Sequence, residues 1–201
     1  MKLLFIYFFL FIVFQSSAKT DNIQDFEIEG ISIGDNLLDH TQKVGVSKEK
    51  ILNQKMTFYP ASKRFGLLAF NYDSETSNYY RLQVTVNPDN YKIYRLGGYV
   101  KISSQNDCLD KQKKITKDLE SFLKNYERLE DIELTPHPAD ETGKSVANGI
   151  YLDLPSGDSV MVECYFWGEE FRAKNSSYDD NLRITLSSKV IIDFINNEAY
   201  K

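Results

Sequence analysis

The sequence predicts an α+β fold: a single domain with an antiparallel sheet, and with one long helix and a few short helices packed on one face. Three observations lead to this prediction. Apolar and polar residues alternate over residues 65–102 and again over 150–186, as they do in strands with one buried face. Residues 106–128, between these stretches, follow helical spacing instead. Turn sequences join neighbouring strands directly, and strands joined by hairpins pair antiparallel.

Residues 1–18 are typical of a cleavable secretory signal. Lys2 precedes an unbroken run of 12 apolar residues, and small residues lead up to Ala18. A helix that spans a bilayer needs about 20 apolar residues, so this run is too short for a lasting anchor. No Cys stands directly after Ala18, which argues against a lipid anchor. We expect cleavage after Ala18 and a single domain over residues 19–201 that is exported, periplasmic or extracellular, with no stable membrane span.

The charge of the chain argues against a nucleic-acid partner. The formal net charge is −5 at pH 7, and loss of Lys2 with the signal makes the remainder more acidic. An acidic protein repels the phosphate backbones whose neutralisation drives nucleic-acid binding. The basic cluster within 110–120 is interleaved with acidic residues, which is typical of a solvated helix face.

The N-terminal part of the domain is expected to hold short elements. Apolar residues of 28–33 alternate around Gly30, and a turn follows at Gly34. Asp35 can cap a short helix that begins near Leu37, because its side chain can accept a hydrogen bond from a free backbone N–H. Ser47 can cap a second helical turn in the same way.

The first long strand region is a predicted hairpin with its turn at residues 87–90. The returning strand covers 91–102, and Gly97 and Gly98 are expected to form a bulge or a bend. The predicted faces are Tyr80, Leu82, Val84 and Val86 on one side of the first strand, Tyr79, Arg81, Gln83 and Thr85 on the other, and Tyr94, Leu96, Val100 and Ile102 on one side of the second.

A long helix and a second set of strands follow. The predicted apolar stripe of the helix is Cys108, Ile115, Leu119 and Phe122, widened by Leu123 and Tyr126. Strands over 150–154 and 160–166 form the clearest hairpin, with its turn at 155–158. A further strand over 182–186 leads into a closing helix whose apolar side is Val190, Ile191 and Phe194.

The chain has two cysteines, Cys108 and Cys164. Cys108 lies on the apolar stripe of the long helix, and Cys164 shares a strand face with Val162 and Phe166, so both should point into the interface between helix and sheet. In an oxidising compartment such a pair is expected to form an intramolecular disulfide. Two separate buried thiols are the alternative. No Cys-x-x-Cys pair suggests redox catalysis.

One loop is a candidate ligand or metal site. His137, Asp140 and Glu141 lie between the long helix and the second set of strands, and a His beside carboxylates can hold a metal or act as a general base. The alternative is an ordinary surface loop whose prolines restrict it. The abundant tyrosines offer a second candidate, because outward-facing rings can form a ligand or partner surface. The rings in question are Tyr79, Tyr80, Tyr91, Tyr94 and Tyr99, with Trp167 at the end of the second hairpin.

Three blocks of the sequence carry a resemblance. Residues 28–39 read Ile-Glu-Gly-Ile-Ser-Ile-Gly-Asp-Asn-Leu-Leu-Asp, residues 137–145 begin His-Pro-Ala-Asp and end Gly-Lys-Ser, and residues 156–165 begin Ser-Gly-Asp-Ser-Val and end Cys-Tyr. On these blocks the chain resembles an uncharacterised family of small exported proteins, bearing signal peptides, from free-living marine bacteria with reduced genomes. The resemblance implies a place in the cell envelope and no particular activity.

These observations favour an exported, non-enzymatic module that binds an envelope partner or a small ligand through its sheet face or its 135–148 loop. No catalytic residue, cofactor or metal is assigned. The alternative is a hydrolase-like or metal-dependent enzyme that uses His137, Asp140 and Glu141. A concave pocket lined by polar groups, near His137 or the outward-facing tyrosines, would mark the binding site.

Overall fold

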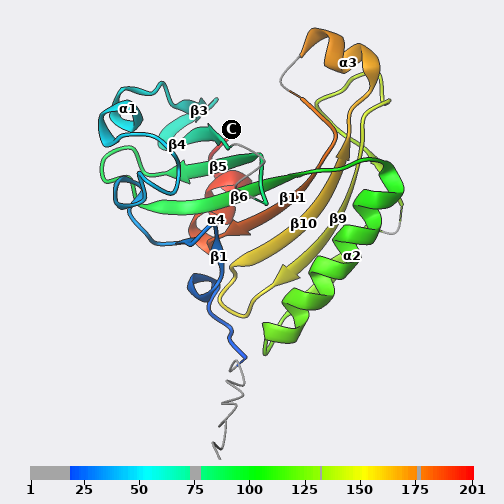
Figure 1. The fold of residues 1–201 in the computed structure, drawn as a ribbon, viewed down its shortest axis with the longest axis horizontal. Coiled ribbons are helices and arrows are strands. Elements are labelled where there is room, and N and C mark those ends of the chain that lie inside the picture. The colour runs from blue at the N-terminus through cyan, green and yellow to red at the C-terminus, as the bar shows by residue number, and fades with distance from the viewer. Residues whose placement is uncertain (1–18, 73–77, 132, 176–177) are drawn as a thin grey trace, which may run out of the picture.

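The computed structural model describes residues 19–72, 78–131, 133–175 and 178–201 (Figure 1). The predicted signal, residues 1–18, lies outside the described residues. Within the described ranges the chain forms one sheet-rich domain with an antiparallel sheet and four α-helices, an α+β arrangement. No helix in these ranges is long and apolar enough to cross a membrane.

Among the described residues, one antiparallel sheet of nine strands forms the body of the domain. The strands pair in the order β3-β4-β5-β6-β11-β10-β9-β7, and β8 also pairs with β9. The last long strand, β11, lies between β6 and β10 and so joins the two predicted sets of strands into one sheet. The bounds are Thr57–Tyr59 for β3, Ser62–Asn71 for β4, Arg81–Val86 for β5, Ile93–Lys101 for β6, Glu127–Glu130 for β7, Thr135–Pro136 for β8, Val146–Asp153 for β9, Ser159–Phe166 for β10 and Asn181–Ser187 for β11.

Short elements precede the sheet in the chain and pack on the main core. They are η1 (Ile23–Asp25), β1 (Glu27–Ile28), β2 (Ile31–Ser32), η2 (Leu37–Asp39) and α1 (Lys48–Asn53). Ser47 caps α1 as predicted, since its side chain accepts from the N–H of Lys50. The predicted cap at Asp35 is wrong. Asn36 caps η2 instead, and Asp35 accepts from the N–H of Ser32 within the preceding turn.

Helix α2 (Gln105–Phe122) lies across β10 and β11 on the face that carries the main core (Figure 1). It ends earlier than the sequence predicts, because the chain turns extended at Leu123, which pairs with Thr20. Leu123 is fully buried, whereas Phe122, predicted to be in the buried stripe, is 46% exposed. Much of the buried stripe is polar: Gln112 and Thr116 follow Cys108 at helical spacing.

Gln112 explains how α2 can bury a polar residue against the sheet. Its side-chain Nε2 donates to the backbone oxygens of Asn148 at 3.0 Å and Val162 at 2.8 Å. A buried amide with such partners keeps most of the hydrogen bonding it had in water. The side chain therefore fixes the helix on β9 and β10, a role that apolar spacing alone does not reveal.

The predicted disulfide between Cys108 and Cys164 agrees with the structure. The sulfur atoms of Cys108 in α2 and Cys164 in β10 are at bonding distance, 2.04 Å, and both residues are fully buried. The bond joins the first turn of the helix to β10, across 56 positions of sequence.

The prediction that the helices share one face is wrong. Helix α4 (Lys189–Asn197) packs through Ile191 and Phe194 on Phe65 and Tyr94, and this smaller cluster lies on the opposite face from α2. Phe65 belongs to this cluster, whereas Leu68 of the same strand belongs to the main core. The two residues are three positions apart, so their side chains lie on opposite faces of the sheet. Val190, predicted on the apolar side, is exposed.

An irregularity between β5 and β6 also differs from the prediction. The register shifts between Thr85 and Val86, so Tyr94 turns to the α4 face while Leu96 stays in the main core. Gly97 and Gly98 keep a regular register and form no bulge.

The two tyrosines before β5 lie on the faces opposite to those predicted. Tyr79 packs against the main core and close to Gly98, whereas Tyr80 lies on the other face with Arg81. The strand begins only at Arg81, so the strict alternation assumed for this region does not extend back to the tyrosines.

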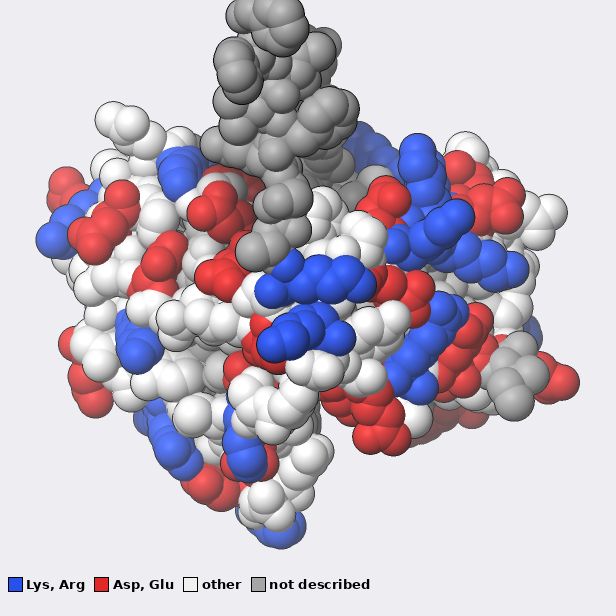
Figure 2. All heavy atoms as spheres, turned by 90° about the horizontal axis from the view of Figure 1, so that it is seen from below, with Lys and Arg blue, Asp and Glu red and all other residues white. Residues whose placement is uncertain are grey.

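The charges of the surface are mixed. Figure 2 shows Lys and Arg side chains interspersed with Asp and Glu over one side of the molecule. In α2, the Lys111 ammonium lies 3.0 Å from the Asp107 carboxylate, one helical turn earlier. This pairing is consistent with the solvated helix face predicted for the basic cluster.

Candidate functional site

A cavity of about 310 Å³ opens on the sheet face opposite α2, at the end of the sheet away from α4. We call it the sheet-end pocket. Strands β5, β6, β10 and β11 form its floor, and the segments before and after helix α3 (Glu169–Lys174) form its wall. Its ring side chains are Tyr80, Tyr99, His137, Tyr165, Trp167 and Tyr178. Its other polar side chains are Arg81, Gln83, Asp179, Asn181 and Arg183.

The floor of the sheet-end pocket is a row of residues directly opposite one another on neighbouring strands. Arg81 of β5 is opposite Tyr99 of β6, Tyr99 is opposite Arg183 of β11, and Arg183 is opposite Glu163 of β10. Directly opposed residues have Cβ atoms about 5 Å apart, so their side chains interact. Antiparallel register thus places two guanidinium groups, one ring and one carboxylate side by side.

Glu163 and Arg183 form a closely bonded ion pair in this row. Both Nε and Nη2 of Arg183 donate to Oε2 of Glu163, at 3.2 and 2.7 Å, and the hydroxyl of Tyr165 donates to Oε1 at 2.7 Å. Arg183 Nη2 also donates to the Tyr165 hydroxyl, and Nη1 lies 3.5 Å from the hydroxyl of Tyr99. A two-pronged contact of this kind orients the guanidinium as well as neutralising it.

The ionisation of this pair follows from two opposing effects. Burial alone would raise the pKa of Glu163, but the charge of Arg183 and the hydrogen bonds outweigh it and lower the pKa. Burial alone would lower the pKa of Arg183, but Glu163 outweighs it and the pKa is raised. Both groups are charged at neutral pH and compensate each other.

Arg81 is the second guanidinium of the pocket, and unlike Arg183 it has no carboxylate partner among the described residues. Its guanidinium carbon lies 5.7 Å from the centre of the Tyr99 ring, and it forms no ion pair with any residue that the structure describes. Its Nε is buried without a hydrogen-bond partner. A buried donor without a partner is costly, which makes Arg81 a natural contact for an acceptor on a bound molecule.

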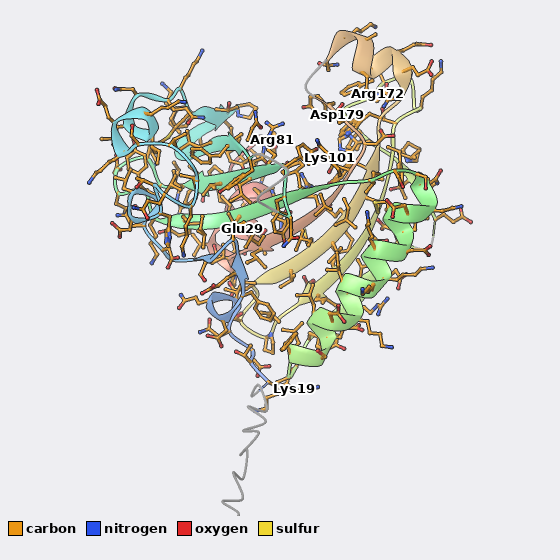
Figure 3. All side chains as sticks on the ribbon, in the orientation of Figure 1. Lys19, Glu29, Arg81, Lys101, Arg172 and Asp179 are labelled. Atoms are coloured by element: carbon orange, nitrogen blue, oxygen red, sulfur yellow. A yellow bond between two sulfur atoms is a disulfide. The ribbon has the colours of Figure 1, made fainter. Side chains whose placement is uncertain are left out.

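Tyr80 lies beside charges of both signs. Burial, and after it the negative charge of Asp179, raise the pKa of Tyr80 to about 12, although Arg81 acts in the opposite direction. The ammonium of Lys101 lies 5.8 Å from the Tyr80 ring centre. Figure 3 shows Arg81, Lys101 and Asp179 gathered at one end of the sheet. The Tyr80 hydroxyl therefore stays protonated in the functional pH range.

The wall of the pocket is a cluster of rings around Trp167. The ring centres of His137 and Tyr178 lie 4.6 and 4.7 Å from that of Trp167, and Phe171 stacks on it at 5.0 Å. Tyr165 is nearly parallel to Trp167, with an angle of 8° between the planes. Such packing fixes the rings and gives a ligand a rigid apolar surface.

Two polar side chains of the wall and floor also lack a partner. Trp167 is 8% exposed and Asn181 is 5% exposed. The indole Nε1 of Trp167 and the amide Oδ1 of Asn181 are buried and have no hydrogen-bond partner among the described residues. Most buried polar atoms in proteins are paired, so this concentration of unpaired atoms around one cavity is unusual.

The structure separates the three residues of the predicted ligand or metal loop. His137 lies in the wall of the sheet-end pocket, whereas Asp140 and Glu141 line a different hollow beside α3. Nδ1 of His137 accepts from the N–H of Ala139, at 3.2 Å. Burial lowers the pKa of His137 and the charge of Arg183 adds to this effect, so the ring is neutral at pH 7.

Asp140 organises its own loop. Its two carboxylate oxygens accept from the backbone N–H and the hydroxyl of both Thr142 and Ser145, at 2.6 to 3.0 Å. Hydrogen bonds from Ser145 and Thr142 hold the pKa of Asp140 well below its usual range. Over the described ranges, no group of three or more His, Cys, Asp or Glu side chains is placed to hold a metal ion.

A larger hollow of about 730 Å³ lies between α1 and the end of β4. Its lining includes exposed residues such as Glu49 and Lys50, together with the buried Phe70. None of its described side chains is a buried polar group without a partner. Size alone therefore does not make it the better candidate for a specific site.

Sequence reasoning found part of the sheet-end pocket. It singled out His137, Tyr80, Tyr99 and Trp167 but missed the charged residues that join them. Arg183 stands between Leu182 and Ile184, at an alternate position of a strand whose other face is core. Charged residues at such positions are the signal that could have revealed the site, and Glu163 shows the same pattern in β10.

Comparison of the chain with protein-family models, with curated proteins and with solved structures gives no match. The sheet-end pocket is therefore interpreted from its own geometry and chemistry.

Proposed function

We propose that this protein is an exported, non-enzymatic binding module whose sheet-end pocket takes a small anion that carries a ring. The observation that carries the proposal is the guanidinium of Arg81, which has no ion-pair partner among the described residues, in a cavity walled by stacked aromatic rings. A cavity of about 310 Å³ is at the small end of ligand sites, which suits a molecule of few atoms.

Each part of the pocket supports one part of this ligand. Arg81 offers a charge and a fixed pair of donors to a carboxylate or a similar anion. Tyr178, which is 42% exposed beside Trp167, offers contact area to a ring. Arg183 is already neutralised by Glu163, so it shapes the floor and adds little net attraction.

Export is supported by one feature of the structure and one of the sequence. The bonded pair of Cys108 and Cys164 fits an oxidising compartment, where disulfides form and persist. The N-terminal sequence has the composition of a secretory signal. A periplasmic or extracellular binding module is the role we infer from the two together.

The test uses Trp167, the single Trp of the chain, as a reporter inside the pocket. Benzoate should give a saturable change in Trp167 emission, and benzyl alcohol, its uncharged analogue, should need at least a tenfold higher concentration. Replacement Arg81→Gln should remove this preference, because the charge that distinguishes the two probes is gone. Arg64→Gln is the matched control, since Arg64 is exposed and pairs with Glu198 far along the chain.

Equal responses to benzoate and benzyl alcohol would show that the pocket does not select for an anion. Retention of the benzoate response in Arg81→Gln would show that Arg81 does not carry the selection. Either result overturns the proposed function.

A further inference from the structure

The sheet-end pocket holds two opposite charges that are not paired with each other. Arg81 and Asp179 both line it and act on the pKa of Tyr80 in opposite directions. Neither forms an ion pair with a residue that the structure describes. The neighbouring Asp180 differs, because its carboxylate accepts from the N–H of Trp167 at 2.8 Å and lies 3.7 Å from Arg172.

Asn181 adds an acceptor beside Asp179. Its Nδ2 donates to the backbone oxygen of Asp179 at 2.7 Å, whereas its Oδ1 has no partner in the part of the chain that the structure describes. Because Asn181 is 5% exposed and lines the pocket, its free amide oxygen is a buried group that a ligand N–H could satisfy. One side of the pocket thus offers a cation to the ligand, and the other side offers a carboxylate and an amide oxygen.

A ligand that carries only a negative charge would bind the Arg81 side of the pocket and leave Asp179 and Asn181 without a partner on the ligand. Its negative charge could meet Arg81, but it would also lie near the exposed carboxylate of Asp179, which repels it. A ligand with a carboxylate and an ammonium would satisfy both sides.

We propose that the ligand is a zwitterion, an α-amino acid with a ring side chain, whose carboxylate binds Arg81 and whose ammonium binds Asp179 and Oδ1 of Asn181. This inference rests on the proposed function and narrows it. The ring of the ligand lies against the exposed ring of Tyr178, which packs edge-on against Trp167. The exposed Lys101 stays at the rim, where water screens its charge.

The experiment compares three probes that differ in one charge at a time. Binding of L-phenylalanine, 3-phenylpropionate and phenethylamine to the full exported protein is measured by calorimetry at pH 7. L-Phenylalanine should bind at least tenfold more tightly than either of the others. 3-Phenylpropionate lacks the ammonium and phenethylamine lacks the carboxylate, so each should lose one of the two contacts.

Two variants assign the contacts. Asp179→Asn should weaken L-phenylalanine about tenfold and leave 3-phenylpropionate unchanged or slightly tighter. Arg81→Gln should weaken the binding of L-phenylalanine and of 3-phenylpropionate, which both carry a carboxylate, and leave the binding of phenethylamine unchanged. Asp89→Asn, an exposed acid in the turn before β6, is the matched control and should change nothing. Equal melting temperatures of all variants would show that folding is intact.

The outcomes separate this inference from the proposed function. The zwitterion proposal is wrong if L-phenylalanine binds no more tightly than 3-phenylpropionate. It is also wrong if Asp179→Asn leaves the affinity for L-phenylalanine unchanged. The anion site still stands in that case, provided that benzoate depends on Arg81. If none of the three probes binds and benzoate also fails, both proposals are wrong.

Discussion

Glu163 and Arg183 show how single residues set the character of the sheet face. Each occupies a strand position whose neighbours in sequence are buried, and each would be expensive to bury alone. Because they lie directly opposite each other on β10 and β11, their charges neutralise each other. The Tyr165 hydroxyl donates a hydrogen bond to the second carboxylate oxygen of Glu163. The floor of the pocket is therefore polar without carrying a large net charge.

Replacement Glu163→Gln should destabilise the fold by about 3–5 kcal/mol, because it leaves the Arg183 charge enclosed without its partner. The double replacement Glu163→Gln with Arg183→Met should recover much of this loss. Urea unfolding at pH 7 measures both. Glu198→Gln is the matched control, since its pair with Arg64 is half exposed and should contribute at most about 1 kcal/mol. A loss in Glu163→Gln no larger than in Glu198→Gln would contradict the role given to the pair.

Periodicity predicted the strands well and their irregularities poorly. The hairpin of β9 and β10 follows strict alternation, and its register is regular from Ser159 to Phe166. The shift at Thr85 changes the face of Tyr94, and such a shift depends on which strand lies opposite, a relation absent from the sequence of one strand. The end of α2 was misplaced for a similar reason, because the contact of Leu123 with Thr20 ends the helix.

The candidate site was predictable only in fragments. Rings and His137 stand out by residue type, so their chemistry could be suspected from composition. The row from Arg81 to Glu163 depends on the pairing of β5, β6, β11 and β10, which places residues far apart in sequence side by side. Strand order is decided by the whole fold, and hairpin patterns alone did not show that β11 lies between the two sets.

The adjacent glycines of β6 provide a test at the scale of one element. A Cβ on Gly98 would lie 2.5 Å from the Tyr79 ring and 3.0 Å from Ile28, so Gly98→Ala should destabilise the fold by about 1–3 kcal/mol. A Cβ on Gly97 meets nothing nearer than Thr185, at 3.5 Å, and Gly97→Ala should be tolerated. Thermal unfolding of the two variants makes the comparison. An equal loss of stability in the two variants would contradict the prediction, because the close approach of Tyr79 exists only at Gly98.

On the scale of the whole molecule, the bond between Cys108 and Cys164 ties the two layers of the fold together. Helix α2 contacts β10 and β11, and the bond fixes the first turn of α2 to β10. Helix α4 lies on the opposite face and covers one end of the sheet. The other end is left open by this division of the helices, and the sheet-end pocket lies there.

Replacement of both cysteines by Ser should lower the free energy of unfolding by about 4 kcal/mol, because a closed loop spanning 56 positions restricts the unfolded chain. Denaturant unfolding of the double variant and of the parent protein measures the loss. Intact mass spectrometry supplies the control: the unreduced parent should be lighter than the reduced one by two hydrogen atoms. Free thiols in unreduced material, or equal stability of the two proteins, would contradict the prediction.

The edge strand β7 has a consequence for the behaviour of the molecule in a crowded compartment. An unpaired strand edge invites a foreign chain to extend the sheet, which is a route to aggregation. Every residue of β7 is exposed, and Glu127, Arg128 and Glu130 carry charge. An incoming strand would have to strip water from these groups, so the open sheet can remain unextended at high protein concentration.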